Sequence, residues 1–315
     1  MSNAAVCLMG PTAAGKTDVA IALCERFPFD IVSVDSALVY RGMNIGTAKP
    51  DAETLRRAPH RLVDIREPEE KYSAGDFVRD ARREIEDISA NGRIPLLVGG
   101  TMMYFRALTG GIAKLPPADE AVRRDIDAAA AKSGWPAMHS RLRKFDPVAA
   151  RRISENDSQR IQRALEVHAV SGRNLSDWLA EAAAQQALPG TAFIKIALQI
   201  PDRKVLHQRI AARLEIMFAN GFVAEVENLM RRPGLKREMP SMRSVGYRQV
   251  WAHLAGECSL EDARYRALVA TRQLAKRQIT WLRSETDLFS TDPLEARAGD
   301  AISAYLDGHR QIFEP

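Results

Sequence analysis

The stretch Gly10-Pro11-Thr12-Ala13-Ala14-Gly15-Lys16-Thr17 matches the phosphate-loop pattern: a glycine, four residues, then glycine, lysine and serine or threonine. The apolar run 4–9 before it predicts a buried strand, and residues 18–26 after it have the apolar spacing of a helix. In such a unit, backbone N–H groups turn toward an anion, and the positive end of the helix dipole faces the same point. The stretch therefore predicts a polyphosphate site.

Two side chains of this loop add specific chemistry. Lys16 supplies a full positive charge, and the hydroxyl of Thr17 can bind Mg²⁺, which we expect as the metal cofactor. The pattern leaves the ligand open, because a nucleoside triphosphate and any diphosphate with Mg²⁺ satisfy the same physics.

The composition is that of a globular protein whose 315 residues suffice for a main domain and an accessory one. We find no apolar run long enough to span a bilayer and no signal peptide. The three cysteines are scattered and form neither a disulfide framework nor a metal-binding pattern. The net charge of +5 is modest. We therefore expect a cytoplasmic protein without membrane contact, and a monomer.

The character of the sequence changes between residues 115 and 189, where it becomes rich in alanine, arginine and acidic residues with helical spacing. Proline-containing segments mark both ends of this region. We predict an α/β fold in which residues 1–114 and 190–315 form a P-loop NTPase-like core, with a parallel sheet flanked by helices. Residues 115–189 are predicted to be an inserted, all-helical domain.

Two further strands are predicted to end beside the phosphate loop. Residues 29–34 lead into Asp35, and residues 94–98 lead into Gly99-Gly100-Thr101. In open α/β sheets, ligands bind at the carboxyl ends of the strands. Asp35 is open to three roles: a carboxylate that organises Mg²⁺, a general base, or a cap of the next turn. The end of the second strand lacks the acidic residue typical of a nucleotide hydrolase, which weakens an ATPase interpretation.

Basic residues recur in several later segments. Residues 156–166 combine amide and guanidinium groups, which suit phosphates and base edges. Arg209 and Arg213 lie one turn apart on a predicted helix, and we favour a functional role for Arg213. The helix predicted near 262–283 has basic residues beside an apolar seam. We expect the chain beyond Arg283 to be loosely ordered, and the roles of three other residues stay open: Arg41, Lys49 and His60.

Taken together, the motifs resemble bacterial tRNA dimethylallyltransferases, also called tRNA isopentenyltransferases. The resemblance covers nearly the whole chain, in order, through segments 10–17, 35–38, 46–50, 99–101, 157–160, 241–249 and 272–283. Ala14 stands where many members have serine. The C-terminal zinc finger of eukaryotic relatives has no counterpart among the three cysteines.

The resemblance implies a reaction. The loop would bind the diphosphate of dimethylallyl diphosphate rather than ATP, through Gly10, Pro11, Thr12, Ala13, Ala14, Gly15, Lys16 and Thr17. The prenyl group would pass to N6 of the adenosine 3′ to the anticodon of tRNA, flipped out of its stack. Asp35 would be the general base and Thr101 would contact the flipped base. Lys16, Mg²⁺ at Thr17, and Arg213 would neutralise the leaving diphosphate.

The same resemblance implies a set of tRNA contacts: Asp35, Ser36, Ala37, Leu38, Thr101, Arg123, Gln159, Arg160, Ile161, Gln162, Arg163, Ser241, Met242, Arg243, Ser244, Val245 and Gly246. Two other functions compete. One is a small-molecule kinase that uses ATP at the loop, and the other is an RNA-binding protein with a relic phosphate loop. The spread of basic segments argues against the first, and the intact Lys16, Thr17 and Asp35 argue against the second.

Overall fold

The structure, a computed structural model, describes residues 4–111, 113–183, 188 and 190–313. The chain forms two compact units, residues 1–106 with 190–315, and residues 107–189. The boundary at which the chain passes from the first unit into the second lies inside helix α4 (Met102–Gly110), whereas the predicted domain boundary is at residue 115. Each unit is described by itself below.

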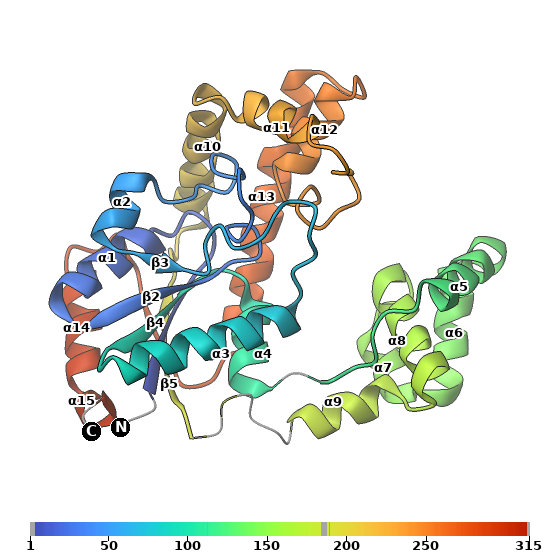
Figure 1. Cartoon of the computed structure of the whole chain (residues 1–315), viewed down its shortest axis with the longest axis horizontal. Helices are drawn as coiled ribbons and strands as arrows, with labels where there is room; N and C mark the ends of the chain where they lie inside the picture. The colour runs from blue at the N-terminus through green and yellow to red at the C-terminus, as the bar shows by residue number, and fades with distance from the viewer. Residues whose placement is uncertain (1–3, 112, 184–187, 189, 314–315) are drawn as a thin grey trace. The chain divides into compact units, whose positions relative to one another are not determined.

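The first unit is built on a parallel sheet (Figure 1). In the described part of the chain it has six strands in the order β3-β2-β4-β1-β5-β6, and every pair is parallel. The strands are β1 (Ala4–Met9), β2 (Phe29–Val34), β3 (His60–Arg61), β4 (Ile94–Gly99), β5 (Ala192–Leu198) and β6 (Leu288–Thr291). The predicted parallel α/β core is confirmed.

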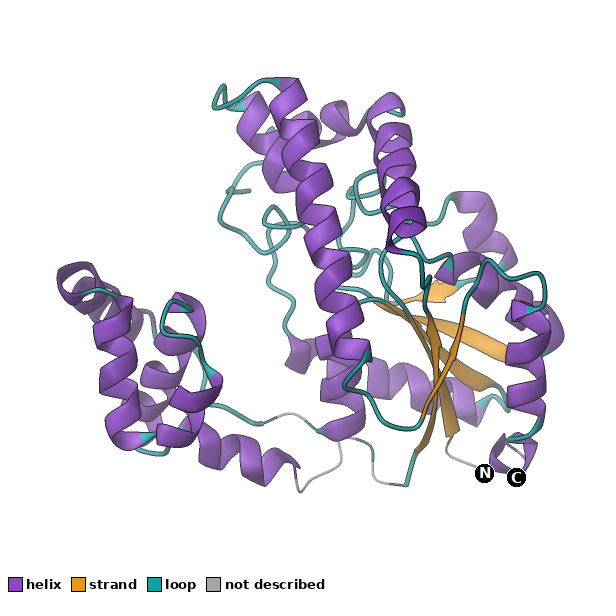
Figure 2. Cartoon of the chain, turned by 180° about the vertical axis from the view of Figure 1, so that it is seen from behind, coloured by secondary structure: helices purple, strands orange, loops and turns teal. Residues whose placement is uncertain are grey.

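Helices cover both faces of this sheet (Figures 1 and 2). The helices of this unit are α1 (Lys16–Arg26), α2 (Ala52–Arg57), α3 (Ala74–Ala90), α10 (Arg203–Ala219), α11 (Phe222–Met230), α12 (Tyr247–Leu254), α13 (Leu260–Leu282), α14 (Ala298–Asp307) and α15 (Arg310–Phe313). Helices α1 and α14 pack together on one face, where alternate strand residues such as Val6 and Leu8 enter a common apolar cluster. Helix α3 packs on β2 and β4. Helices α10 to α13 gather near the carboxyl ends of the strands (Figure 2).

Helix α3 begins with a local hydrogen-bond motif. Ser73 accepts a hydrogen bond from the backbone of Asp76, whose carboxylate binds the backbone N–H of Ser73, forming a capping box. Asp202 likewise caps α10.

The expectation of a loosely ordered C-terminal segment is wrong. Strand β6 pairs with β5, and Ile302 and Leu306 of α14 are fully buried in the core cluster with residues of α1. The sequence prediction missed this because β6 is only four residues long and α14 is a short helix. Tertiary contacts, rather than local sequence signals, keep β6 and α14 ordered.

The second unit is helical. Apart from the end of α4, its described part contains α5 (Glu120–Ser133), α6 (Trp135–Phe145), α7 (Pro147–Arg152), α8 (Ser158–Ser171) and α9 (Leu175–Ala183). Three aspartates cap helices: Asp119 caps α5, Asp146 caps α7 and Asp157 caps α8. Helices α5 to α8 enclose their own apolar cluster, which is separate from that of the sheet.

Candidate active site at the carboxyl edge of the sheet

The phosphate loop joins β1 to α1. Gly15, the N-cap of α1, and Ala13 adopt left-handed backbone angles, with φ of 83° and 65°. Gly10 lies so close to β5 that an added Cβ would be 2.9 Å from the carbonyl oxygen of Leu198. A side chain there would displace the loop from the sheet, which explains the glycine at the first position of the pattern.

Lys16 lies folded against the loop. Its Nζ donates hydrogen bonds to the carbonyl oxygens of Gly10, at 3.0 Å, and Pro11, at 2.8 Å. Burial and the nearby Arg213 guanidinium lower the pKa of Lys16 to about 8, although the Asp35 carboxylate acts in the opposite direction. The loop thus gathers more positive charge than its neighbours compensate, as an anion site requires.

Helix α10 supplies two arginines to the same loop. The Nε of Arg209 donates to the carbonyl oxygen of Ala13 at 2.9 Å, and Arg213 donates to the Thr12 hydroxyl. Burial lowers the pKa of Arg213, while the Asp35 carboxylate raises it and Arg209 lowers it further. The predicted helix face therefore meets the phosphate loop, with both arginines in contact.

Asp35 and Thr101 meet because they follow neighbouring strands. The Asp35 Oδ1 accepts hydrogen bonds from the backbone N–H groups of Ala37, at 2.8 Å, and Leu38, at 3.2 Å. The backbone N–H of Ser36 donates to the Thr101 hydroxyl at 3.2 Å. The capping role considered for Asp35 is thus present. Among the described residues no hydrogen-bond partner is recorded for Oδ2, which leaves this oxygen available to a substrate.

Gln278 of α13 is a site residue that the sequence analysis missed. Its Oε1 accepts from the backbone N–H of Thr12 at 2.9 Å, and its Nε2 donates to the carbonyl oxygen of Gly100 at 2.9 Å. A Cβ on Gly100 would be 2.5 Å from this Nε2. Gln278 is buried on the same helix stripe as Ala275 and Leu282. A polar residue on an apolar stripe was the available signal, since buried amides are hydrogen-bonded.

We expect Gln278→Leu to weaken the binding of inorganic diphosphate about tenfold. The substitution leaves the Thr12 N–H and the Gly100 carbonyl buried without partners, at a cost of about 1–3 kcal/mol, and frees the loop to shift. Isothermal titration with diphosphate and Mg²⁺ measures this. Gln273→Leu is the control, because Gln273 is exposed on the same helix. Equal affinities in both variants would show that Gln278 does not position the loop.

Glu225 of α11 is a second residue that the sequence analysis missed, and it had no sequence signal. Its carboxylate accepts from the backbone N–H groups of Asn44, Ile45 and Gly46 at 2.9, 2.7 and 3.1 Å, and from the Tyr247 hydroxyl at 2.6 Å. It thereby holds the Gly-rich loop that follows the Asp35 segment against α11 and α12.

The segment 241–246 presents only part of its side chains to solvent. The Ser241 hydroxyl donates to the carbonyl oxygen of Pro68 at 2.6 Å, and Ser241 and Met242 are fully buried. Arg243 is exposed. The buried side chains of Ser241 and Met242 therefore anchor the segment in this conformation, and the expected RNA contact of residues 241–246 stays a prediction.

The predicted RNA-binding residues of the helical unit divide in the same way. Arg123 and Arg163 both bind the fully buried carboxylate of Glu166, with N–O distances of 2.9 and 2.6 Å. The side chain of Ile161 is fully buried in the apolar cluster, and its expected RNA contact stays a prediction. Gln159 and Arg160 are exposed. A further contact is that of Gln162, which donates to Asp127.

The three residues whose roles were left open have structural partners. Arg41 pairs with Glu67. Lys49 is almost fully buried and donates to the carbonyl oxygen of Tyr40 and to Asp64. The Nδ1 of His60 lies 2.6 Å from the carbonyl oxygen of Ala58.

Comparisons with known proteins agree on one family. The family model described as IPP transferase matches residues 38–285. A tRNA dimethylallyltransferase of Thiobacillus denitrificans is 54% identical over 306 residues, which cover 96% of this chain and 97% of the relative. One from Cupriavidus necator is 52% identical over 308 residues, covering 96% of each chain.

A solved structure extends this similarity to the fold. The tRNA isopentenylpyrophosphate transferase of Bacillus halodurans is 33% identical and superposes with a TM-score of 0.73, covering 99% of this chain and 98% of that one. Its sequence and fold resemble the whole of both units described above. The chain therefore belongs to the IPP transferase family, the family of the tRNA dimethylallyltransferases.

Proposed function

We propose that this protein transfers a dimethylallyl group from dimethylallyl diphosphate to N6 of the adenosine 3′ to the anticodon of tRNA, releasing diphosphate. The observation that carries this proposal is that Asp35 follows β2 and Thr101 follows β4, while the phosphate loop, which Lys16 and Arg213 contact, follows the adjacent strand β1. An anion site and a carboxylate with a free oxygen thus share one edge of the sheet. The names of the relatives support the same reaction.

The proposed roles follow from the reaction's charge changes. As the bond between the prenyl carbon and the diphosphate oxygen breaks, negative charge grows on diphosphate, where Lys16 and Arg213 neutralise it. The N6 nitrogen forms the new bond to carbon and its proton passes to Asp35. Thr101 lies beside Asp35 and is proposed to contact the base.

The residues present fit a Mg²⁺ ion held mainly by substrate. Mg²⁺ is commonly bound through one or two protein groups together with substrate phosphates and waters. The described residues contain no group of three or more His, Cys, Asp or Glu side chains that could hold a metal, so Thr17 in the first turn of α1 is the protein ligand we propose. When bound, the ion would stabilise charge on the diphosphate.

For tRNA, we propose contacts by Asp35–Leu38, Thr101, Gln159–Arg163, Ser241–Gly246 and Arg123, with the backbone serving where side chains are buried. We propose a monomer that acts in the cytoplasm, where its substrate is found. None of the described helices is long and apolar enough to cross a membrane.

A paired labelling experiment tests this function. Unmodified tRNA and Mg²⁺ are incubated with labelled dimethylallyl diphosphate in one reaction and with γ-labelled ATP in another. We expect label in tRNA from the prenyl donor alone. Label that passes from ATP to an acceptor, with none from the prenyl donor, would favour a P-loop kinase instead.

The lowered pKa of Lys16 predicts how binding of inorganic diphosphate depends on pH. Lys16 is charged below pH 8 and becomes neutral in the ligand-free protein as the pH rises through about 8. Affinity should therefore fall above this pH more steeply in the wild type than in Lys16→Met. Because diphosphate itself titrates identically in both experiments, the difference between the two pH profiles reports on Lys16. Lys204→Met, at the exposed start of α10, is the control. Parallel pH profiles for wild type and Lys16→Met would contradict this role.

A further inference from the structure

Helices α12 and α13 enclose a basic hollow away from the phosphate loop. It has a volume of about 410 Å³ and is lined by Arg237, Arg248, Glu257, Tyr265 and Arg266, together with Gln249, Cys258 and apolar side chains. Arg237 and Glu257 pair with each other. Arg248 and Arg266 are exposed, and among the described residues neither guanidinium group has an ion pair or a side-chain hydrogen bond. The hollow therefore carries two uncompensated positive charges.

Tyr265 gives this hollow an aromatic surface. It is 67% exposed, the most exposed of the large hydrophobic side chains that the structure describes. Tyr265 belongs to α13 and lines two neighbouring hollows. Basic groups beside an exposed aromatic ring are the combination by which proteins bind RNA strands, through phosphates and stacked bases.

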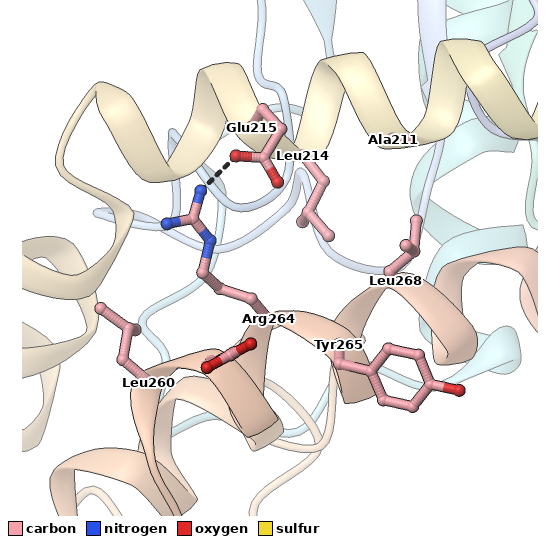
Figure 3. Close-up of a pocket in the computed structure, with 8 residues that line it drawn as sticks. Ala211, Leu214, Glu215, Leu260, Arg264, Tyr265 and Leu268 are labelled. Carbon is pink, nitrogen blue, oxygen red and sulfur yellow. Dashed lines mark hydrogen bonds and ion pairs between the residues drawn. The ribbon is translucent and has the colours of Figure 1, made fainter.

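The neighbouring hollow, between α10 and α13, differs in chemistry (Figure 3). Its walls include Leu214, Leu260 and Leu268, and its cation, Arg264, is paired with Glu215. Figure 3 shows the Tyr265 ring pointing away from this ion pair. Among the described residues that line the two hollows, the cations without a side-chain partner, Arg248 and Arg266, both line the hollow formed by α12 and α13.

We propose that the hollow formed by α12 and α13 is a second RNA-binding surface, in which Arg248 and Arg266 contact phosphates of the substrate RNA and Tyr265 stacks on a base. This rests on the proposed function, because it takes tRNA as the substrate. Arg248, which lines the hollow, lies in the first turn of α12 and follows the segment 241–246, which is proposed to contact RNA, by two positions in the sequence. The free arginines favour an anionic partner over an apolar one, and the exposed Tyr265 ring beside them favours RNA, because an acidic protein face offers carboxylates but no bases to stack.

The dependence of RNA binding on salt tests the two arginines. In the full-length double variant Arg248→Gln/Arg266→Gln, the plot of log affinity for unmodified tRNA against log salt should be shallower by about 1.5 units, since each lost phosphate contact removes about 0.7–0.9. The KM for tRNA should rise, while the KM for the prenyl diphosphate stays at the wild-type value. Arg56→Gln, an exposed arginine of α2 without a recorded ion pair, should match the wild type.

Tyr265 is tested by a pair of substitutions. Tyr265→Leu should weaken tRNA binding about fivefold or more, because stacking on an aromatic ring contributes about 1–3 kcal/mol per base, whereas Tyr265→Phe should keep wild-type affinity. The proposal would be overturned if the double variant kept the wild-type tRNA affinity and salt slope. It would also be overturned if Tyr265→Leu and Tyr265→Phe lost the same amount of tRNA affinity. Because RNA binding is titrated directly, these results are independent of prenyl transfer. Wild-type protein that binds tRNA without transferring label would contradict the proposed function alone.

Discussion

Replacing Asp35 by asparagine lowers kcat for prenyl transfer about 10²-fold or more and leaves tRNA affinity nearly unchanged. This is the expected result if Asp35 accepts the N6 proton, since a positioned general base contributes about 10²–10⁴-fold. Asparagine keeps an Oδ1 that can accept from the N–H groups of Ala37 and Leu38, so the turn is preserved while the base is removed. Single-turnover rates with labelled prenyl diphosphate measure the effect.

Comparison with Asp35→Ala separates the two roles of this carboxylate. Alanine removes both the base and the turn, so its kcat should be at or below that of Asp35→Asn. Asp51→Asn is a matched control, because Asp51 caps α2 through the N–H of Thr54 at 2.8 Å, outside the site. An Asp35→Asn variant with wild-type turnover, beside an impaired Asp35→Ala, would limit Asp35 to capping.

Glu166→Ala should destabilise the helical unit by about 3 kcal/mol. Removing one partner of a buried ion pair costs about 3–5 kcal/mol, and the lower value applies because Arg123 and Arg163 remain 32% and 28% exposed. The backbone N–H of Asp119 also loses its acceptor. Hydrogen exchange of the amides in α5 and α8 of the full-length protein measures the loss.

The ionisation of Glu166 adds a pH dependence. Burial raises the pKa of its carboxyl, but the hydrogen bonds from Arg163, Arg123 and Asp119 outweigh burial and lower the pKa below its ordinary value. The stabilisation is therefore complete above the unfolded-state pKa of about 4.3 and is lost as the pH falls below it. Glu166→Ala should lose this acid sensitivity. Glu181→Ala, at a surface pair with Arg173, should behave as wild type, and equal protection in both variants would contradict the assignment.

Much of the fold could be predicted because local signals agreed with tertiary structure. The phosphate loop, the strand before it and the capped helix α3 combine apolar periodicity with short-range hydrogen bonds, which the sequence displays directly. Asp35 and Thr101 could also be placed, since residues that follow neighbouring parallel strands share one edge of the sheet. The names of the relatives agree with the resemblance on which the reaction was based.

What could not be predicted depends on contacts between distant residues. Gln278 accepts a hydrogen bond from the N–H of Thr12, which lies 266 positions away in the sequence. Glu225 lies about 180 positions from the loop that it holds. The sequence also did not show that Ile161 and Met242, which belong to segments expected to contact RNA, have buried side chains. A motif identifies a segment, and only packing decides which of its side chains face outward.

The elements that form the core of the first unit are far apart in the sequence, and this has a consequence for protein synthesis. Strands β5 and β6 and helix α14 follow the helical unit in sequence, yet α14 completes the apolar cluster around α1 and β1. The helical unit has its own cluster and can fold as soon as it leaves the ribosome. The phosphate loop, by contrast, precedes most of its supports, so α10 and α13 must emerge before Arg213 and Gln278 can fix it. A nascent chain therefore carries an unsupported anion-binding loop, a natural target for chaperones, until synthesis has passed α13.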